Sequence, residues 1–543
     1  MSLIHIQQHE VEIRHFHLFC GLGGGAMGFN AGEARVGSLS AKFRCVGGVD
    51  IDEGAIKDFS TLVGVKGTVL DLFSKQQYEA FHGREPPSDW NEAGIPDIQR
   101  AAGWERPHII FLSAPCKGFS GLMSSQKSAT DKYQALNELT LRGVWLALEA
   151  YKDDPVELYV FENVPRITVR GRHLLDQITD LFRFYGYAVA ETTHDCGELG
   201  GLAQSRRRFL LVARHQSKVP PYLYEPHKKP LRSVGEILSR LPLAGDVEAA
   251  GPMHRIPSLH WKTWVRLAFV EAGSDWRCLN QLRVENGVLK DFYLTCGVNK
   301  GLAGRLNIAD PGFRVSQKWE SGQAFGVRGW GDSSGAITCQ RSPGQGVFSV
   351  ADPRTGYSNN THTNIYRVIK FNESCKTITG ASHVTGGSGC VADPRGNGSA
   401  VQYQVTGLSS AAPIDFGGYG GETLPAANDK LVAYIQALDG THHRPFTTLE
   451  LAALQGLFCP DTDTVPRLSG STDSDWRERI GNAVPPPAAQ SIASIMGETL
   501  LLAWSGQTFT LSNNNVWVRS GKAGDHHMGM RQVAIALSVD GLT

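Results

Sequence analysis

A thiol, a carboxyl group, two guanidinium groups and an amide lie in four short motifs spread along this chain of 543 residues. Cys116 closes an apolar run, and Glu162 begins a Glu-Asn-Val-Pro segment. Arg206 and Arg208 alternate within Gln-Ser-Arg-Arg-Arg, and Asn482 lies within Gly-Asn-Ala-Val. Each motif adjoins an expected strand or helix end, so together these groups could handle one polar heterocycle.

Cys116 lies shortly after one expected strand, and Glu162 lies just past the end of another. A lone cysteine is usually buried and inert, whereas exposure at the ligand side of an α/β sheet favours a reactive thiolate. The alternative for Glu162 is a surface charge, although the Asn-Val-Pro that follows makes a constrained loop. Arg206 and Arg208 alternate on a strand and should share one face, with a solvated basic edge as the alternative.

A glycine-rich loop at 21–25 follows the first expected strand. Its backbone N–H groups and the helix that follows suit a polar ligand, although such a loop also fits a nicotinamide cofactor or a tight turn. Asp50 ends the second strand, where a carboxylate can bind ribose hydroxyls; the alternative is an N-cap for a helix starting near Glu53. With Asp71 and Leu72 at a third strand end, these residues predict a pocket for an adenosine-containing cofactor.

Short apolar runs and amphipathic stretches alternate through the first 215 residues. Strands are predicted at 15–19, 43–49, 108–112 and 158–161. Helices are predicted at 132–151, 172–185, 447–456 and 487–504. The pattern predicts an α/β fold with a doubly wound, mostly parallel sheet. Too few residues separate 187–193 from 209–212 for a crossover helix, so these strands should pair antiparallel at the sheet edge.

The middle of the chain contains an internal repeat. Residues 326–354 align without gaps on 367–395, with ten identities in 29 positions, and a partial third copy ends at 309–311. The spacing of 41 to 42 residues is typical of stacked modules, and we expect a small, loop-rich, mainly β insertion. Between 300 and 404 there are eleven Lys and Arg against six Asp and Glu, which favours phosphate contact or an ordinary solvated surface.

The composition excludes several classes of protein. Hydrophobic residues make up 41% and charged residues 20%, which is typical of a globular chain of two or more domains. Ten cysteines without a CxxC pair of zinc spacing argue for free thiols in a reducing compartment. No signal peptide or membrane span is evident. The balance of 53 basic and 53 acidic residues argues mildly against nucleic acid as a partner.

The motifs and their order resemble those of the DNA (cytosine-5)-methyltransferase family in its unpermuted arrangement. Besides the motifs above, 444–456 resembles the family's ninth motif and 481–484 its tenth. The resemblance covers roughly 1–215 and 444–503. Ala114 stands where a second proline is common and Lys117 where glutamine is common. Neither change removes a reacting atom, but both could alter the loop that closes over the base.

The resemblance implies S-adenosyl-L-methionine as cofactor, S-adenosyl-L-homocysteine as product, and no metal. Asp50 would bind the ribose, Ile51 would lie under the adenine, and Asp71 would meet the adenine amino group. The full set of cofactor-binding residues implied is Phe19, Gly21, Leu22, Gly23, Gly24, Asp50, Ile51, Asp71, Leu72, Pro115, Asn482 and Ala483.

The resemblance also implies a mechanism. The Cys116 thiolate attacks C6 of a flipped-out cytosine, which makes C5 nucleophilic toward the methyl group. Glu162, when protonated, donates to N3 and accepts from the exocyclic amine. Arg206 and Arg208 hold the base carbonyl and nearby phosphate or carboxylate groups. Transfer to C5 and loss of its proton then release Cys116.

The implied organisation is a Rossmann-like catalytic domain over 1–215 and 444–543, with a target-recognition domain at 216–443. The repeats are either tandem recognition modules or structural padding. The expected partner is double-stranded DNA. We also expect a monomer in the cytoplasm of a bacterial cell or phage-infected host, without membrane contact and with or without a cognate restriction endonuclease.

Three rival functions compete with this interpretation. An RNA methyltransferase would keep the chemistry, but the long insertion argues for DNA. A catalytically silent DNA-binding scaffold is disfavoured because Cys116, Glu162 and both arginines are present. A nicotinamide oxidoreductase would explain the glycine loop but not the other motifs.

Overall fold

The computed structural model describes most of the first 260 residues and selected segments beyond them. The described residues are 9–115, 131–260, 263, 267, 283–285, 288–290, 327–329, 349–351, 368–370, 372–378, 390–393, 428–432, 442–506 and 514–519. The chain divides into two compact units. The first comprises residues 1–232, 374–380 and 451–543, and the second comprises 233–373 and 381–450. The first unit therefore includes a short piece of the segment that the sequence assigns to target recognition.

The first unit is built on an eight-stranded sheet with the order β2-β3-β1-β5-β6-β9-β7, in which β4 also pairs with β3. Its strands are β1 (His9–Leu18), β2 (Arg35–Val36), β3 (Leu39–Asp50), β4 (Thr68–Val69), β5 (Ile109–Leu112), β6 (Leu158–Asn163), β7 (Tyr187–Asp195) and β9 (Arg207–His215). Strands β1, β3, β4, β5 and β6 run parallel. The predicted doubly wound, mostly parallel sheet is confirmed.

The antiparallel edge is also confirmed. Strand β9 pairs antiparallel with β6 on one side and with β7 on the other. The turn between β7 and β9 holds only the short helix α9 (Cys196–Gly200) and the two-residue strand β8 (Gln204–Ser205). A segment this short cannot cross the sheet to make a parallel connection.

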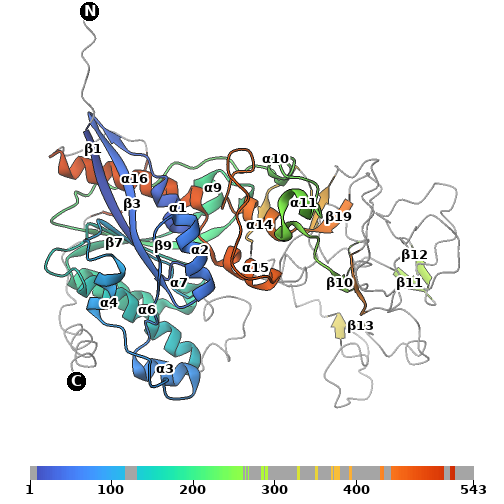
Figure 1. The fold of residues 1–543 in the computed structure, drawn as a ribbon, viewed down its shortest axis with the longest axis horizontal. Helices are drawn as coiled ribbons and strands as arrows, with labels where there is room; N and C mark the ends of the chain where they lie inside the picture. Colours follow the sequence, from blue (N-terminus) through green and yellow to red (C-terminus); the bar gives the residue numbers. More distant parts are fainter. Residues whose placement is uncertain are drawn as a thin grey trace, which may run out of the picture. The chain divides into compact units, whose positions relative to one another are not determined.

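Helices cover both faces of the sheet, because its strands are apolar on both sides (Figure 1). One face packs on α3 (Lys75–His82), α4 (Ile95–Ala101), α6 (Asp131–Glu149) and α8 (Arg172–Phe184). The other packs on α1 (Gly24–Asn30), α9 and α16 (Pro486–Trp504). Among its described residues this unit also contains the helices α2 (Glu53–Val63), α7 (Ile167–Arg170) and α15 (Asp473–Asn482). The predicted helices at 132–151, 172–185 and 487–504 are thus confirmed.

A segment near the C-terminus adds to the second of these faces. Trp517 and Val518 are buried in the same apolar cluster as α16. The Trp517 indole N–H donates to Thr192 Oγ1 on edge strand β7 at 3.0 Å, and the Arg214 guanidinium donates to the Val518 carbonyl. These contacts cover the outer strand of the sheet.

No helix among the described residues is long and apolar enough to span a membrane.

In its described residues the second unit consists mainly of short strands. They are β10 (Leu259–His260), β11 (Arg283–Glu285), β12 (Val288–Lys290), β13 (Val327–Gly329), β14 (Ser349–Ala351), β15 (Val368–Lys370), β17 (Cys390–Asp393), β18 (Lys430–Leu431) and β19 (His442–Pro445). Its short helices are α10 (Val234–Leu238), α11 (Val247–Ala250) and the 3-10 helix η1 (Pro252–His254). Helix α14 (Thr448–Leu454), which confirms the helix predicted at 447–456, crosses the unit boundary.

The two copies of the internal repeat pair their strands in the same way. In the first copy β13 pairs parallel with β14, with Val327 opposite Ser349. In the second copy β15 pairs parallel with β17, with Val368 opposite Cys390. Both members of the second pair lie 41 residues after their counterparts, the offset of the sequence alignment. The partial third copy at 309–311 lies outside the described residues.

Candidate functional site

The site residues predicted from the sequence gather at one edge of the sheet. Parallel strands place their carboxyl ends at the same edge, and ligands of open α/β sheets bind there. The chain runs from β1 to β3 and β4 on one side and continues with β5 and β6 on the other. The order of the strands thus changes direction between β1 and β5. Phe19, Asp50, Asp71, Pro115 and Glu162 all lie at or just beyond strand ends of this edge.

The glycine loop is held between β3 and the start of α16. The Gly21 backbone N–H donates to Asp50 Oδ2 at 2.8 Å. Gly23 caps α1 with a left-handed φ of 95°, and a Cβ atom there would meet Phe59 and Val63 of α2. A Cβ atom on Gly24 would come within 2.3 Å of the Val484 carbonyl oxygen. The loop therefore touches the Gly-Asn-Ala-Val motif, and glycine is required for that approach.

Phe19 adopts a left-handed conformation with a φ of 55°, which is strained for a residue other than glycine. A Cβ atom on Gly143 of α6 would lie only 2.8 Å from the Phe19 ring. The ring thus occupies the space left by a helix glycine. Leu22 is buried within the loop.

The carboxylate of Asp50 is partly enclosed by backbone donors. Its Oδ1 accepts from the Asp52 N–H and its Oδ2 from the Gly21 N–H. Burial raises the pKa of Asp50, and these donors partly offset the rise. The N-cap of α2 is Asp52, whose side chain accepts from Ala55 N–H, so the N-cap alternative for Asp50 is wrong. Ile51 leaves 61% of its side chain exposed beside it.

Asp71 is fixed by two hydrogen bonds beyond β4. Its Oδ1 accepts from the Phe73 backbone N–H and its Oδ2 from the Trp90 indole N–H, both at 3.0 Å. The neighbouring Leu72 is buried in the core. Asn482, across from the glycine loop, is exposed, whereas Ala483 is buried.

The ends of β5 and β6 are joined by side-chain hydrogen bonds. Ser113 Oγ donates to Glu162 Oε2 at 2.9 Å, and Asn163 Nδ2 contacts the Ala114 carbonyl at 3.4 Å. Glu162 is only 7% exposed. The described chain stops at Pro115, so Cys116 and Lys117 lie outside the described residues. Ser113, which contacts Glu162, nevertheless lies only three residues before Cys116 in the sequence.

Arg208 completes the surroundings of Glu162. Its Nε lies 2.8 Å from Glu162 Oε1, so the carboxylate is held between a guanidinium and a hydroxyl. Both side chains are largely buried, so removing either partner would leave the other charge buried and uncompensated. Arg207, in contrast, is exposed. The structure therefore excludes a fully solvated basic edge.

Arg206 is engaged elsewhere. The strand is interrupted at this residue, between β8 and β9. Arg206 and Arg208 are both less exposed than Arg207, as the alternation predicted, but the two contact different groups. Arg206 is 2% exposed, and its two terminal nitrogens donate to the carbonyls of Ile378 and Gly481, each at 2.8 Å. It therefore ties the segment 374–380 to the end of α15.

Gln204 strengthens the same connection. Its Nε2 donates to Gln455 Oε1 at 2.6 Å and its Oε1 accepts from the Ile378 N–H. Gln455 in turn donates to the Ala483 carbonyl. Strand β8 also pairs parallel with β16 (Cys375–Lys376). The Gln-x-Arg part of the motif therefore acts within the scaffold in this structure.

Three residues of this site were not predicted from the sequence. Ser113 and Trp90 orient Glu162 and Asp71, and Arg479 forms a buried ion pair with Asp58 of α2. Ser113 lies two residues before the Pro-Cys pair, and this proximity is the only sequence signal among the three. Trp90 and Arg479 have none, because they reach the site through tertiary contacts alone.

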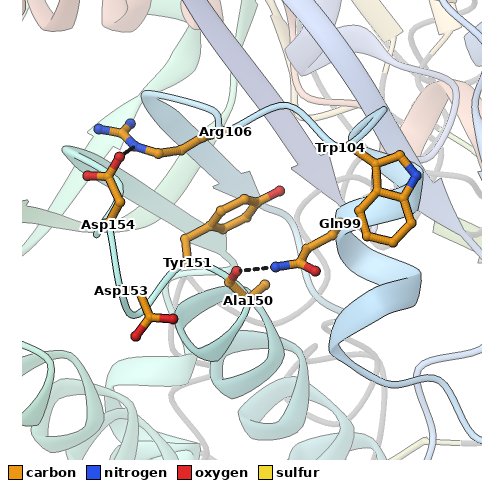
Figure 2. A pocket seen from close by; sticks show the side chains of 7 residues that line it. All are labelled: Gln99, Trp104, Arg106, Ala150, Tyr151, Asp153 and Asp154. Carbon is orange, nitrogen blue, oxygen red and sulfur yellow. Dashed lines mark hydrogen bonds and ion pairs between the residues drawn. The ribbon is translucent and has the colours of Figure 1, made fainter.

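A hollow of about 370 Å³ lies at the opposite edge of the sheet, where β5 begins and α6 ends (Figure 2). It contains none of the predicted site residues. Its lining is Gln99, Trp104, Arg106, Ala150, Tyr151, Asp153 and Asp154. Ion pairs of Arg106 with Asp154 and Glu157 consolidate this region, and we assign it no role in the chemistry.

A comparison with protein-family models identifies the class. Residues 13–247 match the model of the C-5 cytosine-specific DNA methylases. This range contains the glycine loop, Asp50, Asp71, Glu162 and both site arginines. The chain therefore contains a C-5 cytosine-specific DNA methylase domain over residues 13–247, consistent with a DNA cytosine-5-methyltransferase.

Solved structures of methyltransferases align with most of this chain at low sequence identity. EhMeth of Entamoeba histolytica gives a TM-score of 0.43 at 12% identity, covering 90% of this chain and 98% of its own. A putative DNA modification methyltransferase encoded within an Escherichia coli prophage gives 0.41 at 14% identity, covering 90% and 99%. At these scores the likenesses decide neither fold nor function. A comparison with curated protein sequences gave no significant match.

Proposed function

We propose that this protein transfers a methyl group from S-adenosyl-L-methionine to C5 of a flipped-out cytosine in double-stranded DNA, through a covalent bond between Cys116 and C6. The observation that carries the proposal is the arrangement around Glu162. A buried carboxyl group, held by Ser113 and Arg208, lies at the strand edge from which Pro115 leads into Cys116. A carboxyl group and a thiol that follow neighbouring strands at one sheet edge can act together on one pyrimidine.

The cofactor would lie across the ends of β1, β3 and β4. Asp50 would accept from ribose hydroxyls, and Ile51 offers an exposed apolar surface to the adenine. The glycine loop offers backbone N–H groups at the start of α1. When bound, the cofactor supplies an activated methyl group on a sulfonium. The remaining residues proposed to bind it are Phe19, Gly21, Leu22, Gly23, Gly24, Asp71, Leu72, Pro115, Asn482 and Ala483.

The proposed chemistry on the base uses Cys116 and Glu162, with Ser113 and Arg208 as the partners that hold Glu162. Cys116 adds its thiolate to C6, and the electron pair of the C5–C6 double bond becomes available at C5. Glu162, protonated, donates to N3 and accepts from the exocyclic amine, while Ser113 and Arg208 fix the plane of its carboxyl group. After C5 has gained the methyl group, loss of its proton re-forms the double bond and expels Cys116.

Arg206 takes a positioning role in this proposal. Its guanidinium is committed to the carbonyls of Ile378 and Gly481, so it would act on the recognition segment and on the Gly-Asn-Ala-Val motif rather than on the base. Arg208, which contacts Glu162 directly, is the arginine proposed to act on the base.

The segment 216–443 is proposed to recognise the DNA sequence through base edges in the major groove. The matching strand registers of the two repeats favour two equivalent modules, each contributing to recognition. The protein is further proposed to act as a monomer, with no metal taking part in methyl transfer, in the cytoplasm of a bacterium or phage-infected host. Deleting 326–354 and mapping the methylated sites tests the repeats: an unchanged set of target sequences contradicts separate recognition modules.

The proposed reaction can be tested with duplex DNA of mixed sequence, labelled S-adenosyl-L-methionine and bisulfite sequencing. We expect label at C5 of cytosines within a defined sequence, and none with Cys116→Ser. Cys459→Ser, which removes an exposed thiol elsewhere, is the matched control and should retain activity. Label in transfer RNA instead of DNA would favour the RNA methyltransferase, and label in neither would favour a silent scaffold.

A further inference from the structure

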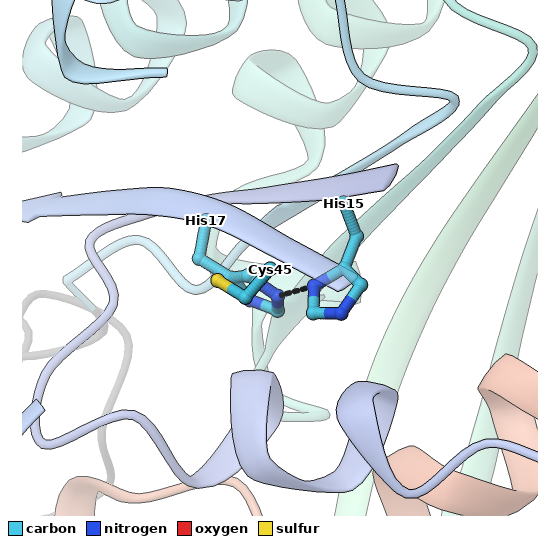
Figure 3. A group of neighbouring side chains, drawn as sticks. All are labelled: His15, His17 and Cys45. Carbon is cyan, nitrogen blue, oxygen red and sulfur yellow. Dashed lines mark hydrogen bonds between the residues drawn. The ribbon is translucent and has the colours of Figure 1, made fainter. Parts of the chain in front are cut away.

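Two imidazoles and a thiol meet in the core between β1 and β3, away from the residues proposed for methyl transfer. His15, His17 and Cys45 are at most 2% exposed, and one ring nitrogen of each histidine and the Cys45 sulfur all lie within 4.8 Å of one another (Figure 3). His15 and His17 are two positions apart on β1 and thus share a face of the sheet. Cys45 lies directly opposite His15 in the parallel register.

The backbone is irregular at this point. The register of β1 and β3 shifts between His15 and Phe16, so that Phe16 lies opposite Gly47. Such a bulge changes the direction of neighbouring side chains and often accompanies a functional site. Here it follows Cys45 directly and lies between the two histidines.

The hydrogen bonds fix which ring nitrogens carry lone pairs. Asn30 Oδ1 accepts from the Cys45 backbone N–H at 2.9 Å and lies 3.0 Å from His15 Nε2. His15 Nε2 is therefore a donor, and Nδ1 of this neutral ring keeps its lone pair. Since His15 Nδ1 lies 2.9 Å from His17 Nε2, His17 donates. A histidine whose other nitrogen is already held by an amide oxygen is oriented as metal-binding histidines are.

All three groups are neutral in this environment. Burial lowers the pKa of His15 to about 3 and that of His17 well below its usual value. Burial also raises the pKa of the Cys45 thiol to about 12. The rings of Phe29 and Phe111 pack against the histidines. An ion bound here must therefore leave the site nearly uncharged, because uncompensated charge in an apolar core is costly.

We propose that His15 Nδ1, His17 Nε2 and Cys45 Sγ bind one Cu(I) ion. Copper(I) prefers soft thiolate and imidazole donors, and one thiolate cancels its single charge. Zn²⁺ would leave a net positive charge and normally takes four ligands, whereas this group supplies three. Binding releases the Cys45 thiol proton to solvent and moves the His17 proton from Nε2 to Nδ1. With bonds of about 2.0 Å to nitrogen, the two ring nitrogens separate to about 3.5 Å.

The ion would cross-link β1 and β3, whose ends carry the glycine loop and Asp50, and it takes no part in methyl transfer. No CxxC pair marks this site in the sequence. The ligands lie in two ordinary strand patterns, and only the pairing of the strands brings them together.

The test uses the full-length protein, stripped of metal and kept anaerobic, with Cu(I) delivered from a chromophoric chelator. We expect one equivalent to be withdrawn from the chelator, and a rise in melting temperature of about 5 °C. X-ray absorption at the copper edge should show two imidazole nitrogens and one sulfur. Cys45→Ser should lose this equivalent and the thermal shift, while Cys196→Ser, which removes another buried thiol, should keep both.

Several outcomes would overturn the proposal. The proposal is contradicted if the protein withdraws no Cu(I) from the chelator, or if the copper is coordinated by sulfur alone. It is also contradicted if Cys45→Ser still binds one equivalent of Cu(I). Tighter binding of Zn²⁺ by the same ligands, with a fourth donor in its absorption spectrum, would also contradict the copper assignment. Should Cys45→Ser fail to fold, the stoichiometry and spectrum of the unaltered protein still decide the question.

Discussion

Replacing Arg206 tests whether the Gln-x-Arg part of the motif supports the scaffold. Arg206→Met keeps much of the buried side-chain volume but removes two donors, each 2.8 Å from a main-chain carbonyl. Hydrogen bonds from charged groups contribute at least about 1.5 kcal/mol each, so we expect a loss of about 3 kcal/mol. In a unit of this size that corresponds to a fall in melting temperature of roughly 5–10 °C.

Arg206→Met should lower the stability of the segment 375–378 in particular, as well as that of the whole unit. The amides of Cys375 and Ile378 donate to the Ala203 carbonyl and to Gln204 Oε1, and these bonds depend on the place that Arg206 fixes. Hydrogen exchange of 375–378 should therefore accelerate at least tenfold in Arg206→Met. Arg206→Lys should recover part of the protection, because lysine restores a cation but not the two-pronged geometry.

The matched control is Arg207→Met, since Arg207 is the exposed member of the same triplet. It should change the melting temperature by less than about 1 °C and leave the exchange of 375–378 unchanged. The proposed role of Arg206 is refuted if Arg206→Met leaves that exchange unaltered and melts within about 2 °C of the parent. Methylation assays then separate the two roles: KM for DNA should rise in Arg206→Met, whereas Arg208→Lys should mainly lower kcat.

Three further predictions concern catalysis, acid stability and the glycine loop. Glu162→Gln should lower kcat about 100-fold or more in the methylation assay, with a melting temperature near that of the parent; a smaller effect would contradict the proposed proton donor. Because the pKa of His15 is about 3 in the folded protein and near 6.5 when unfolded, only the unfolded state gains this proton between those values. The free energy of unfolding should thus fall by about 2 kcal/mol per such histidine from pH 6.5 to 5. When it is measured by urea titration at several pH values, it should depend less steeply on pH in His15→Gln than in the parent. Gly24→Ala should destabilise the protein by more than about 2 kcal/mol, since its Cβ would meet the Val484 carbonyl at 2.3 Å. Gly37→Ala, with a φ of 58° and open space, should cost only about 1 kcal/mol.

The sheet could be predicted because its signals are local. Strand β5 and the first four residues of β6 are continuous apolar runs, and the short connection between 193 and 209 excluded a crossover. The clustering of Asp50 and Glu162 followed from the same rule, since both lie near carboxyl ends of parallel strands. The choice between Asp50 and Asp52 as helix cap needed the structure, because two carboxylates so close in sequence can both reach the first turn of α2.

The remaining features depend on contacts that no local pattern encodes. Arg206 reaches carbonyls 172 and 275 residues away, and a carbonyl is present at every position, so sequence cannot identify its partner. Strand alternation predicted one face for Arg206 and Arg208, but the interruption between β8 and β9 gives each its own surroundings. The motif thus serves two purposes within five residues. Gln204 and Arg206 hold 375–378 and 481–483, and Arg208 holds Glu162, so a piece of the first unit distant in sequence and the proposed proton donor are both positioned by one turn of the chain.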